Sequence, residues 1–389
     1  MMVLVVGDYR TEHAESMTSA IRRAFGRDND LRTLFVRDVI SAKEILSDPD
    51  VEPLRCIFID GAAAHVEEFI AWMRGQEQLF SVPIFALVPH VCDQAFRETN
   101  GYGADDTLGD RDMGAITRRM AVLEEYRTSV RPPITAGNVV IAHSDQKLRR
   151  LFGKTMRNAG FNLIFASDEA ELMNTAEVSP RPKLVIAEYA LTDGDVFAEI
   201  ERYRANASDT KLPFVLLGRG SDFHNIATDT GPVDVVELMS DSAPPDNLLF
   251  LTNELLRRVF LSGKADQRAS ERLLYGTLCA FRHAGDLSSA YGYCYNISFE
   301  GMYVKTFDPP RIDSEIWLEM RPPGEIIGVH LRGTVVWVRL PDNSRAVTVP
   351  PGFGLRIDSN ACPPGDLEKY RASYKQLREN RRLYYPVTI

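Results

Sequence analysis

The sequence predicts a mixed fold: two doubly wound α/β domains with parallel sheets, then a small antiparallel β-barrel and a C-terminal helix. Two observations support this fold class. In the first two-thirds of the chain, short apolar runs alternate with stretches of helical periodicity, and the same order occurs twice. Beyond about residue 262 the apolar period changes to two, with turns rich in glycine, proline and aspartate. Alternating strands and helices favour a parallel sheet, and short strands at close spacing favour a barrel.

The first α/β domain is expected at residues 1–127. Residues 3–8 are an apolar run that ends in a polar turn, as buried parallel strands do. Residues 56–60 and 82–88 are two more such runs, and the first of them ends in Asp60. A helical stripe between the first two runs completes the βα pattern.

The same order returns at residues 137–261, after a linker around Arg131-Pro-Pro. Apolar runs lie at residues 139–142, 184–188 and 213–217. Right-handed crossovers place the carboxyl ends of such strands at one edge of each sheet, where open α/β sheets bind ligands.

The barrel is expected at residues 262–362, followed by a helical tail at 363–389. Its predicted strands lie around residues 279–282, 292–297, 302–306, 315–320, 329–340 and 350–357. Trp317 and Trp337 fall in these strands and are expected to pack within the barrel. In the tail, one helical face carries four apolar or aromatic residues: Leu367, Tyr370, Tyr374 and Leu377.

Composition excludes several classes of function. The net charge of −9 implies no general affinity for nucleic acid or anionic membranes. The opening MMVLVVGDYR is not a signal peptide, and no apolar run reaches the ~18 residues that span a bilayer. The five cysteines and seven histidines show no disulfide or metal-ligand spacing. We therefore expect a cytoplasmic protein without a membrane span, a metal site or a nucleic-acid partner.

One group of residues near the predicted barrel has the chemistry of a ligand site. Arg268 and Arg272 stand four residues apart, and Asn296, Ser298 and Gly301 follow within the barrel. The planar donor fork of arginine matches phosphate and guanine acceptors. Asn and Ser add directional hydrogen bonds, and Gly lets a ligand approach the backbone. The structural alternative is that both arginines are solvated charges on a linker and that the Asn-x-Ser segment is a turn.

This order of residues, R-x-x-x-R followed by [DN]-x-S-x-x-G, resembles the PilZ domain. The stretch Pro350-Pro-Gly-Phe-Gly-Leu-Arg-Ile is similar to the closing strand of PilZ barrels, and the segment looks like the myxobacterial type. The resemblance implies that cyclic di-GMP is the regulatory ligand. It also implies that Arg268, Arg272, Asn296, Ser298 and Gly301 form the binding site.

The two α/β domains each resemble a response-regulator receiver domain. Receivers carry an acidic pair that binds Mg²⁺, a phosphoacceptor Asp, a hydroxyl residue and a Lys. In the first copy Asp8 and Asp60 match this pattern, but the hydroxyl position falls on Val88 and the Lys position on Asp110. A carboxylate at the Lys position repels an added phosphoryl group.

The second copy departs further from the receiver pattern. His143 and Ser144 replace the acidic pair, Glu188 replaces the phosphoacceptor, and Gly218 replaces the hydroxyl residue. We therefore interpret both copies as pseudo-receivers that dock protein partners, with a vestigial site at Asp8, Asp60 and Glu188 and no bound Mg²⁺.

No catalytic motif such as G-x-x-x-x-G-K-[ST], H-E-x-x-H or G-x-S-x-G occurs, so we expect no enzymatic activity. The first hypothesis is a cyclic di-GMP effector that acts as a signalling adaptor, regulating motility or polarity. The second is a ligand-independent scaffold of PilZ and receiver surfaces. The third is a response regulator gated by phosphorylation of Asp60. The sequence identifies neither the protein partner nor the oligomeric state.

Overall fold

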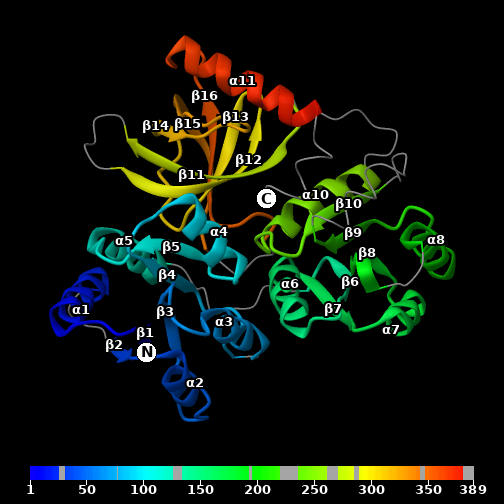
Figure 1. Ribbon diagram of the computed structural model, residues 1–389, viewed down its shortest axis with the longest axis horizontal. Helices are drawn as coiled ribbons and strands as arrows, with labels where there is room; N and C mark the ends of the chain where they lie inside the picture. The colour runs from blue at the N-terminus through cyan, green and yellow to red at the C-terminus, as the bar shows by residue number, and fades with distance from the viewer. Residues whose placement is uncertain are drawn as a thin grey trace.

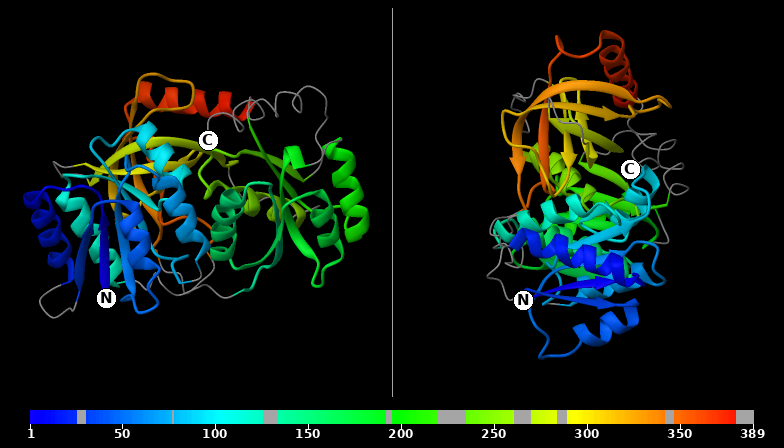
Figure 2. Two further views of the ribbon diagram at one scale, coloured as in Figure 1. Left: turned by 60° about the horizontal axis from the view of Figure 1, so that its bottom comes forward. Right: turned by 90° about the vertical axis from the view of Figure 1, so that its left-hand side faces the viewer.

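The computed structural model describes residues 1–25, 31–76, 78–125, 134–191, 195–219, 235–260, 270–283, 289–341 and 347–379. Two α/β domains lie side by side, and a β-barrel lies across both of them (Figure 1). Two further views show the same arrangement, with the barrel stacked on the α/β layer (Figure 2). The fold class predicted from the sequence is therefore confirmed.

The first α/β domain has a five-stranded parallel sheet in the order β2-β1-β3-β4-β5. This is the flavodoxin-like strand order. Every side chain of β1 is buried because helices cover both faces of the sheet. The elements are β1 (Met2–Val6), α1 (Thr11–Phe25), β2 (Arg32–Val36), α2 (Val39–Leu46), β3 (Leu54–Asp60), α3 (Val66–Gly75), β4 (Ile84–Val88), α4 (Asp93–Gly101), β5 (Asp106–Gly109) and α5 (Met113–Glu125).

The second α/β domain repeats this topology with the order β10-β9-β8-β6-β7. Aspartates at the N-caps of its helices accept backbone N–H groups, for example Asp145 from Lys147. The main elements are β6 (Gly137–Ala142), α6 (Gln146–Asn158), β7 (Phe161–Ala166), α7 (Glu169–Asn174), β8 (Pro182–Glu188), α8 (Val196–Ala207), β9 (Phe214–Gly218), β10 (Val236–Ser240) and α10 (Asn247–Phe260).

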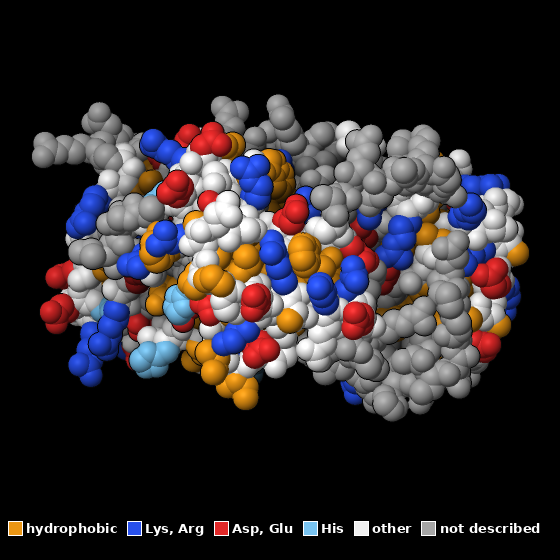
Figure 3. Space-filling view, turned by 90° about the horizontal axis from the view of Figure 1, so that it is seen from above, with side chains coloured by type: hydrophobic (Ala, Val, Ile, Leu, Met, Phe, Trp, Pro, Cys, Tyr) orange, Lys and Arg blue, Asp and Glu red, His pale blue; other side chains and the backbone are white. Residues whose placement is uncertain are grey.

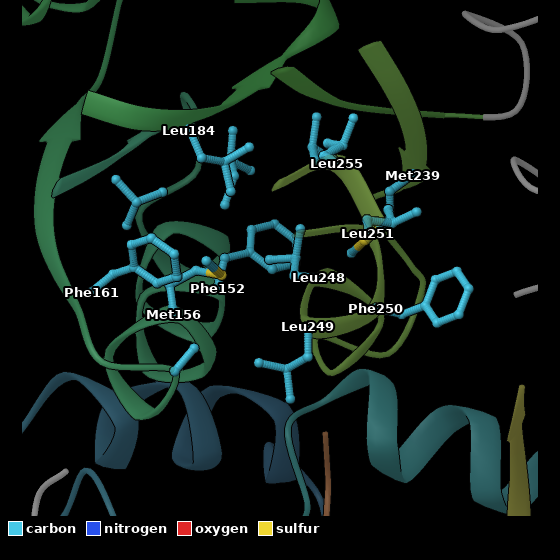
Figure 4. Close-up of a cluster of buried hydrophobic side chains, with 14 of the residues drawn as sticks. Phe152, Met156, Phe161, Leu184, Met239, Leu248, Leu249, Phe250, Leu251 and Leu255 are labelled. Carbon is cyan, nitrogen blue, oxygen red and sulfur yellow. The ribbon is translucent and has the colours of Figure 1, made fainter. Parts of the chain in front are cut away.

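The core of the second domain forms between α6 and α10, as Figure 4 shows. Phe152 and Met156 of α6 meet Leu248 and Leu251 of α10, and all four side chains are buried. The same cluster continues into the barrel, where it includes Tyr295. The second domain and the barrel therefore share one hydrophobic core.

The two α/β domains touch through α3 and α6, which lie next to each other in Figure 1. A Cβ added at Gly75 would lie 2.8 Å from Cδ of Arg150 on α6. Gly103 has a φ of +99° and lies against Leu151, so its backbone conformation and the close approach both require glycine.

The C-terminal domain is a closed six-stranded barrel in the order β11-β12-β13-β16-β15-β14. Its strands approach closely at Gly301, where a Cβ would lie only 2.3 Å from the Leu355 carbonyl oxygen of β16. The strands are β11 (Leu273–His283), β12 (Ala290–Ser298), β13 (Gly301–Lys305), β14 (Glu315–Met320), β15 (Val329–Arg339) and β16 (Gly352–Ile357).

Helix α11 (Pro364–Glu379) packs on the barrel and buries the face predicted from the sequence. That face is confirmed: the buried residues of the helix include Leu367, Tyr370, Tyr374 and Leu377. All four belong to the hydrophobic core of the barrel, so α11 is an integral part of this domain.

The loop after β13 anchors the barrel to the first domain. Phe307 is 4% exposed and meets Phe85 of β4 edge-on, with ring centroids 5.2 Å apart. Beside it, buried Arg119 of α5 donates to Asp106 at 3.1 Å and to Asp308 of the barrel loop at 3.3 Å. A barrel residue thus completes the core of the first domain.

Two expectations about the barrel differ from the structure. The first strand, expected around residues 279–282, begins earlier: Leu273 and Leu274 start β11, because one packs inside the barrel and the other against the second domain. Trp337 is 44% exposed and lies outside the barrel interior, where its ring packs on Tyr303. Trp317 is also only partly buried, and the guanidinium carbon of Arg332 lies 3.4 Å from its ring centroid.

The surface face shown in Figure 3 carries Lys and Arg side chains interspersed with Asp and Glu, with hydrophobic side chains between them. In the described parts of the chain, no helix combines the length and apolar character needed to cross a membrane.

Candidate functional site

The structure brings four of the five predicted barrel-site residues to one end of three neighbouring strands. Arg272 directly precedes β11, where Leu273 pairs with Ile297 and Leu274 with Asn296. Ser298 ends β12 and pairs with Gly301 at the start of β13. Arg268 lies outside the described residues. Antiparallel pairing thus places Arg272 beside the Asn-x-Ser segment, although 24 or more residues separate them in sequence.

The turn from Ser298 to Gly301 is held by the C-terminal helix. Ser298 Oγ donates to the Gly301 carbonyl at 3.2 Å. The Tyr370 hydroxyl lies 2.8 Å from the carbonyl oxygens of both Ser298 and Gly301. Tyr374 donates to the Glu271 carbonyl at 2.9 Å, next to Arg272. Burial raises the pKa of Tyr370 well above its ordinary value, so this hydroxyl keeps its proton.

Two of the predicted site residues, Gly301 and Asn296, also have structural roles in the barrel. Gly301 permits the close approach of β16, as described above, so its small size serves barrel closure. Asn296 is only 5% exposed and lies at a β-bulge where the β12–β13 register shifts. Arg272, in contrast, is exposed at the surface.

The site adjoins the interface with the second α/β domain. Leu274, the partner of Asn296 in the sheet, and Tyr295, its neighbour in sequence, both belong to the core cluster of that domain. Tyr295 meets Phe250 of α10 edge-on at 6.3 Å and donates to the Asp246 carbonyl at 2.6 Å. Asn296 is therefore flanked by two residues of this interface.

Two cationic side chains near the turn were missed by the sequence analysis. The guanidinium carbon of Arg371 lies 4.7 Å from the ring centroid of Phe299, and Lys375 Nζ lies 5.8 Å from it. Their spacing of four residues places them on one side of a helix, which the sequence did indicate. What the sequence could not indicate is that α11 lies against residues 298–301.

The donor set fits a phosphate-bearing ligand in part. Arg272 offers an exposed guanidinium, and Arg371 and Lys375 add positive charge beside the turn. Ser298 is partly exposed, whereas Asn296 is buried.

In the first α/β domain, Asp8 and Asp60 lie at the carboxyl edge of the sheet as predicted. Asp8 is exposed and pairs with Arg37 at 3.4 Å. Asp60 Oδ1 accepts the Ala62 backbone N–H at 3.0 Å, which holds it in a local turn. Asp110 follows β5, where receivers carry Lys.

Tyr9 is an unforeseen occupant of this acidic site. A Cβ on Gly7 would lie 2.6 Å from the Tyr9 ring and 3.1 Å from Cβ of Asp60, so the ring packs against Gly7 next to Asp60. Burial, together with the charges of Asp60 and Asp110, raises the pKa of Tyr9. No spacing pattern in the sequence indicates this role.

In the second domain, a basic residue occupies a receiver's acidic position and an acidic residue occupies its Lys position. Glu188 Oε2 accepts the Ser144 backbone N–H at 2.7 Å and lies 3.5 Å from His143 Nδ1. His143 is 3% exposed, and its Nε2 lies 3.7 Å from Oδ1 of Asp241. A histidine thus stands at an acid position, and Asp241, just after β10, stands where receivers carry Lys. Over the described ranges, no group of three His, Cys, Asp or Glu side chains is arranged to hold a metal ion.

Comparison with known proteins assigns the barrel to a family. Residues 266–362 match the model of the family described as PilZ domain. No curated protein matches the sequence. The structure titled "PilZ domain with c-di-GMP of YcgR from Escherichia coli" is 18% identical, covers 30% of this chain and 95% of its own, and gives a TM-score of 0.23.

Two other solved structures are similar at the same low level. A putative response regulator from Chloroflexus aurantiacus is 20% identical, covers 31% of this chain and 98% of its own, and gives a TM-score of 0.27. The Bacillus subtilis inhibitor of motility MotI/DgrA is 14% identical with a TM-score of 0.25; 30% of this chain matches 53% of that one, about half its length. TM-scores this low support no functional conclusion.

Proposed function

Residues 266–362 are a PilZ domain, and from this premise we propose that the chain is a non-enzymatic signalling adaptor that binds cyclic di-GMP at the barrel. Arg268 and Arg272 are the proposed phosphate and guanine anchors, with Asn296 and Ser298 as further hydrogen-bonding groups. The two degenerate receiver-like domains carry the response to a protein partner. We propose that the process controlled is bacterial motility or cell polarity.

One observation supports the adaptor mechanism above others. Strand β12 carries Asn296 and Ser298, and the same strand carries Tyr293 and Tyr295, which contact the first and second α/β domains respectively. A ligand that shifts β12 or orders Arg272 against it changes both interfaces. The ligand biases the domain arrangement only by its different affinities for the two arrangements.

The direct test is titration of the full chain with cyclic di-GMP in a calorimeter. Saturable binding in the wild type and weaker binding in Arg272→Ala support the proposal. Arg311→Ala is the matched control, because Arg311 is exposed in the loop at the other end of β13 and should leave affinity unchanged. Absence of saturable heat at micromolar ligand would favour the second hypothesis.

That second hypothesis is a ligand-independent scaffold, and one observation favours it. Asn296 is buried, and Gly301 is explained by the approach of β16, so both residues have structural reasons to occupy their positions. A scaffold would bind its protein partner equally well with and without cyclic di-GMP. Pull-down of the partner in the presence and in the absence of the ligand distinguishes a scaffold from a ligand-controlled adaptor.

The third hypothesis, phosphorylation at Asp60, has less support. The Tyr9 ring lies next to Asp60, and Asp110 takes the place of the Lys that would stabilise a phosphoryl oxygen. We therefore propose that both α/β domains act as docking modules whose positions, and not their phosphorylation, carry the signal.

A further inference from the structure

A cavity of about 60 Å³ lies where all three domains meet. Ser81, Pro83 and Asp105 line it from the first domain, Lys154, Asn158 and Asp246 from the second, and Lys305, Arg339 and Pro351 from the barrel. No other site described above involves this space, and the site on the 298–301 turn lies at the opposite end of β13 from Lys305.

The side chains around this cavity carry more buried positive than negative charge. Lys154 Nζ lies 2.5 Å from Asp105 Oδ1, and Arg74 lies 2.9 Å from Asp105 Oδ2, so one carboxylate faces two cations. Lys305 Nζ lies 2.6 Å from Asp246 Oδ2. Three cations therefore face two carboxylates.

The burial of these cations makes that imbalance significant. The side chains of Arg74, Lys154 and Lys305 are 0%, 13% and 7% exposed. Buried charges are costly unless they are paired. Burial and the nearby Arg74 guanidinium, only partly offset by Asp105, lower the pKa of Lys154 to about 8. Burial alone disfavours a charged ammonium, and the Arg74 charge adds to that effect.

Hydrogen-bond donors remain available at the cavity. Each ammonium has three N–H donors. Lys305 donates to Asn100 at 2.5 Å and to Asp246 at 2.6 Å, and Lys154 donates to Asp105 at 2.5 Å. Among the residues that the structure places, these are their partners. Two donors of Lys154 and one of Lys305 are therefore open to a ligand in the cavity that both residues line.

We propose that this three-domain cavity binds a small tetrahedral oxyanion of the phosphate or sulfate class, held between Lys154 and Lys305. The anion accepts the open ammonium donors and neutralises the surplus charge. The cavity has room for about four water-sized spheres, which suits four oxygens. Because Lys154 belongs to the second domain and Lys305 to the barrel, the anion stabilises the assembled arrangement of the domains.

The size and position of the cavity decide the source of the anion. All three domains contribute to its lining, and its inner space of about 60 Å³ matches a free tetrahedral anion. The free anion is therefore the ligand that we propose. Water or chloride filling the same space is the alternative that the experiment must separate.

The experiment is thermal unfolding of the full chain, without cyclic di-GMP, against rising inorganic phosphate, with sodium chloride at matched ionic strength. We expect a saturable rise in Tm with phosphate, and with sulfate in a second series, but not with chloride. Lys154→Met should weaken the apparent phosphate affinity by at least about tenfold. Lys147→Met, which removes an exposed ammonium from the same helix, is the matched control.

Two further variants keep the test sharp. Ser81→Phe fills the cavity without removing a charge, so it should abolish the phosphate response even if Lys154→Met folds poorly. Arg272→Ala should retain the response, which separates this cavity from the proposed cyclic di-GMP site. A response that is absent in the wild type, equal in chloride, unchanged in Ser81→Phe or lost in Arg272→Ala would overturn the proposal.

Discussion

The ring of Phe96 on α4 stacks on the ring of Tyr293 on β12, with centroids 5.5 Å apart and planes inclined by 7°. Around this pair, Asp93 accepts hydrogen bonds from the β11 residues Thr277 and Leu278, and Arg97 donates to the Gly276 carbonyl at 3.1 Å. The α4 helix of the first domain is thus docked on the two strands that carry Asn296 and follow Arg272. Barrel and α/β domains form one coupled structure.

The Lys305–Asp246 ion pair should contribute substantially to stability. Asp246→Asn leaves the buried Lys305 ammonium with only neutral partners, so we expect the free energy of unfolding to fall by about 3 kcal/mol. Chemical denaturation measures this. Glu169→Gln, which breaks the exposed pair with Arg202, should cost about 0–1 kcal/mol; equal losses in both variants would contradict the role given to Lys305.

The acid sensitivity of the protein should depend on Asp105. Burial opposes its ionisation, but Lys154 and Arg74 outweigh that effect and hold the pKa of Asp105 at about 2, below its ordinary 3.8. As the pH falls, Asp105 is protonated in the unfolded chain before it is protonated in the folded protein. Ionised Asp105 therefore contributes about 2 kcal/mol to the free energy of unfolding above pH 3.8, and this contribution is lost as the pH falls towards 2.

Denaturation curves over that pH range test this dependence. Asp105→Asn should be less stable at neutral pH and should show a shallower acid limb than the wild type. Asp50→Asn, at an exposed loop position, should leave the acid limb unchanged. Parallel acid limbs in the wild type and Asp105→Asn would show that this carboxylate is not held ionised by its neighbours.

Helix α11 should stabilise the turn that carries Ser298. Tyr370→Phe removes a buried hydroxyl that lies within hydrogen-bond distance of two carbonyl oxygens. We therefore expect the free energy of unfolding to fall by about 1–3 kcal/mol and hydrogen exchange at residues 298–301 to become faster. Tyr275→Phe, whose hydroxyl serves the Arg321 carbonyl at a more exposed position, is the control. Unchanged hydrogen exchange at residues 298–301 would show that α11 does not stabilise this turn.

Neither α/β domain should respond to phosphoryl donors. Incubation with acetyl phosphate or beryllofluoride and Mg²⁺ should leave the mass of the Asp60 peptide and the elution volume unchanged, because Asp110 stands at the Lys position and repels the phosphoryl group. A stoichiometric adduct at Asp60 would restore the response-regulator hypothesis.

Ligand binding should be visible at the start of the barrel. If Arg272 closes on the ligand, hydrogen exchange at residues 270–275 should slow on adding cyclic di-GMP, together with residues 296–301. Protection of residues 296–301 alone would mean that Arg272 takes no part in binding and that the coupling to the α/β domains proceeds by another route.

Local patterns sufficed to predict the architecture, because buried strands such as β1 are continuously apolar and the helical face of Tyr370 and Tyr374 has a clear period. The sequence motif likewise pointed to residues that strand pairing brings together. Contacts between domains could not be predicted from the sequence. Neither the insertion of Phe307 into the first domain nor the meeting of Lys305 with Asp246 leaves a spacing signal, since each depends on how whole domains pack. Tyr9 shows the same limit within one domain.

We propose above all that the barrel binds cyclic di-GMP through Arg272 and its neighbours. Calorimetric titration of the wild type, Arg272→Ala and Arg311→Ala tests it most directly. A charge-assisted hydrogen bond is worth about 1.5–3 kcal/mol, so Arg272→Ala should bind roughly ten- to a hundredfold more weakly than the wild type, with Arg311→Ala unchanged. A wild-type protein that gives no saturable heat with micromolar cyclic di-GMP, or an Arg272→Ala variant that binds as tightly, would contradict the account.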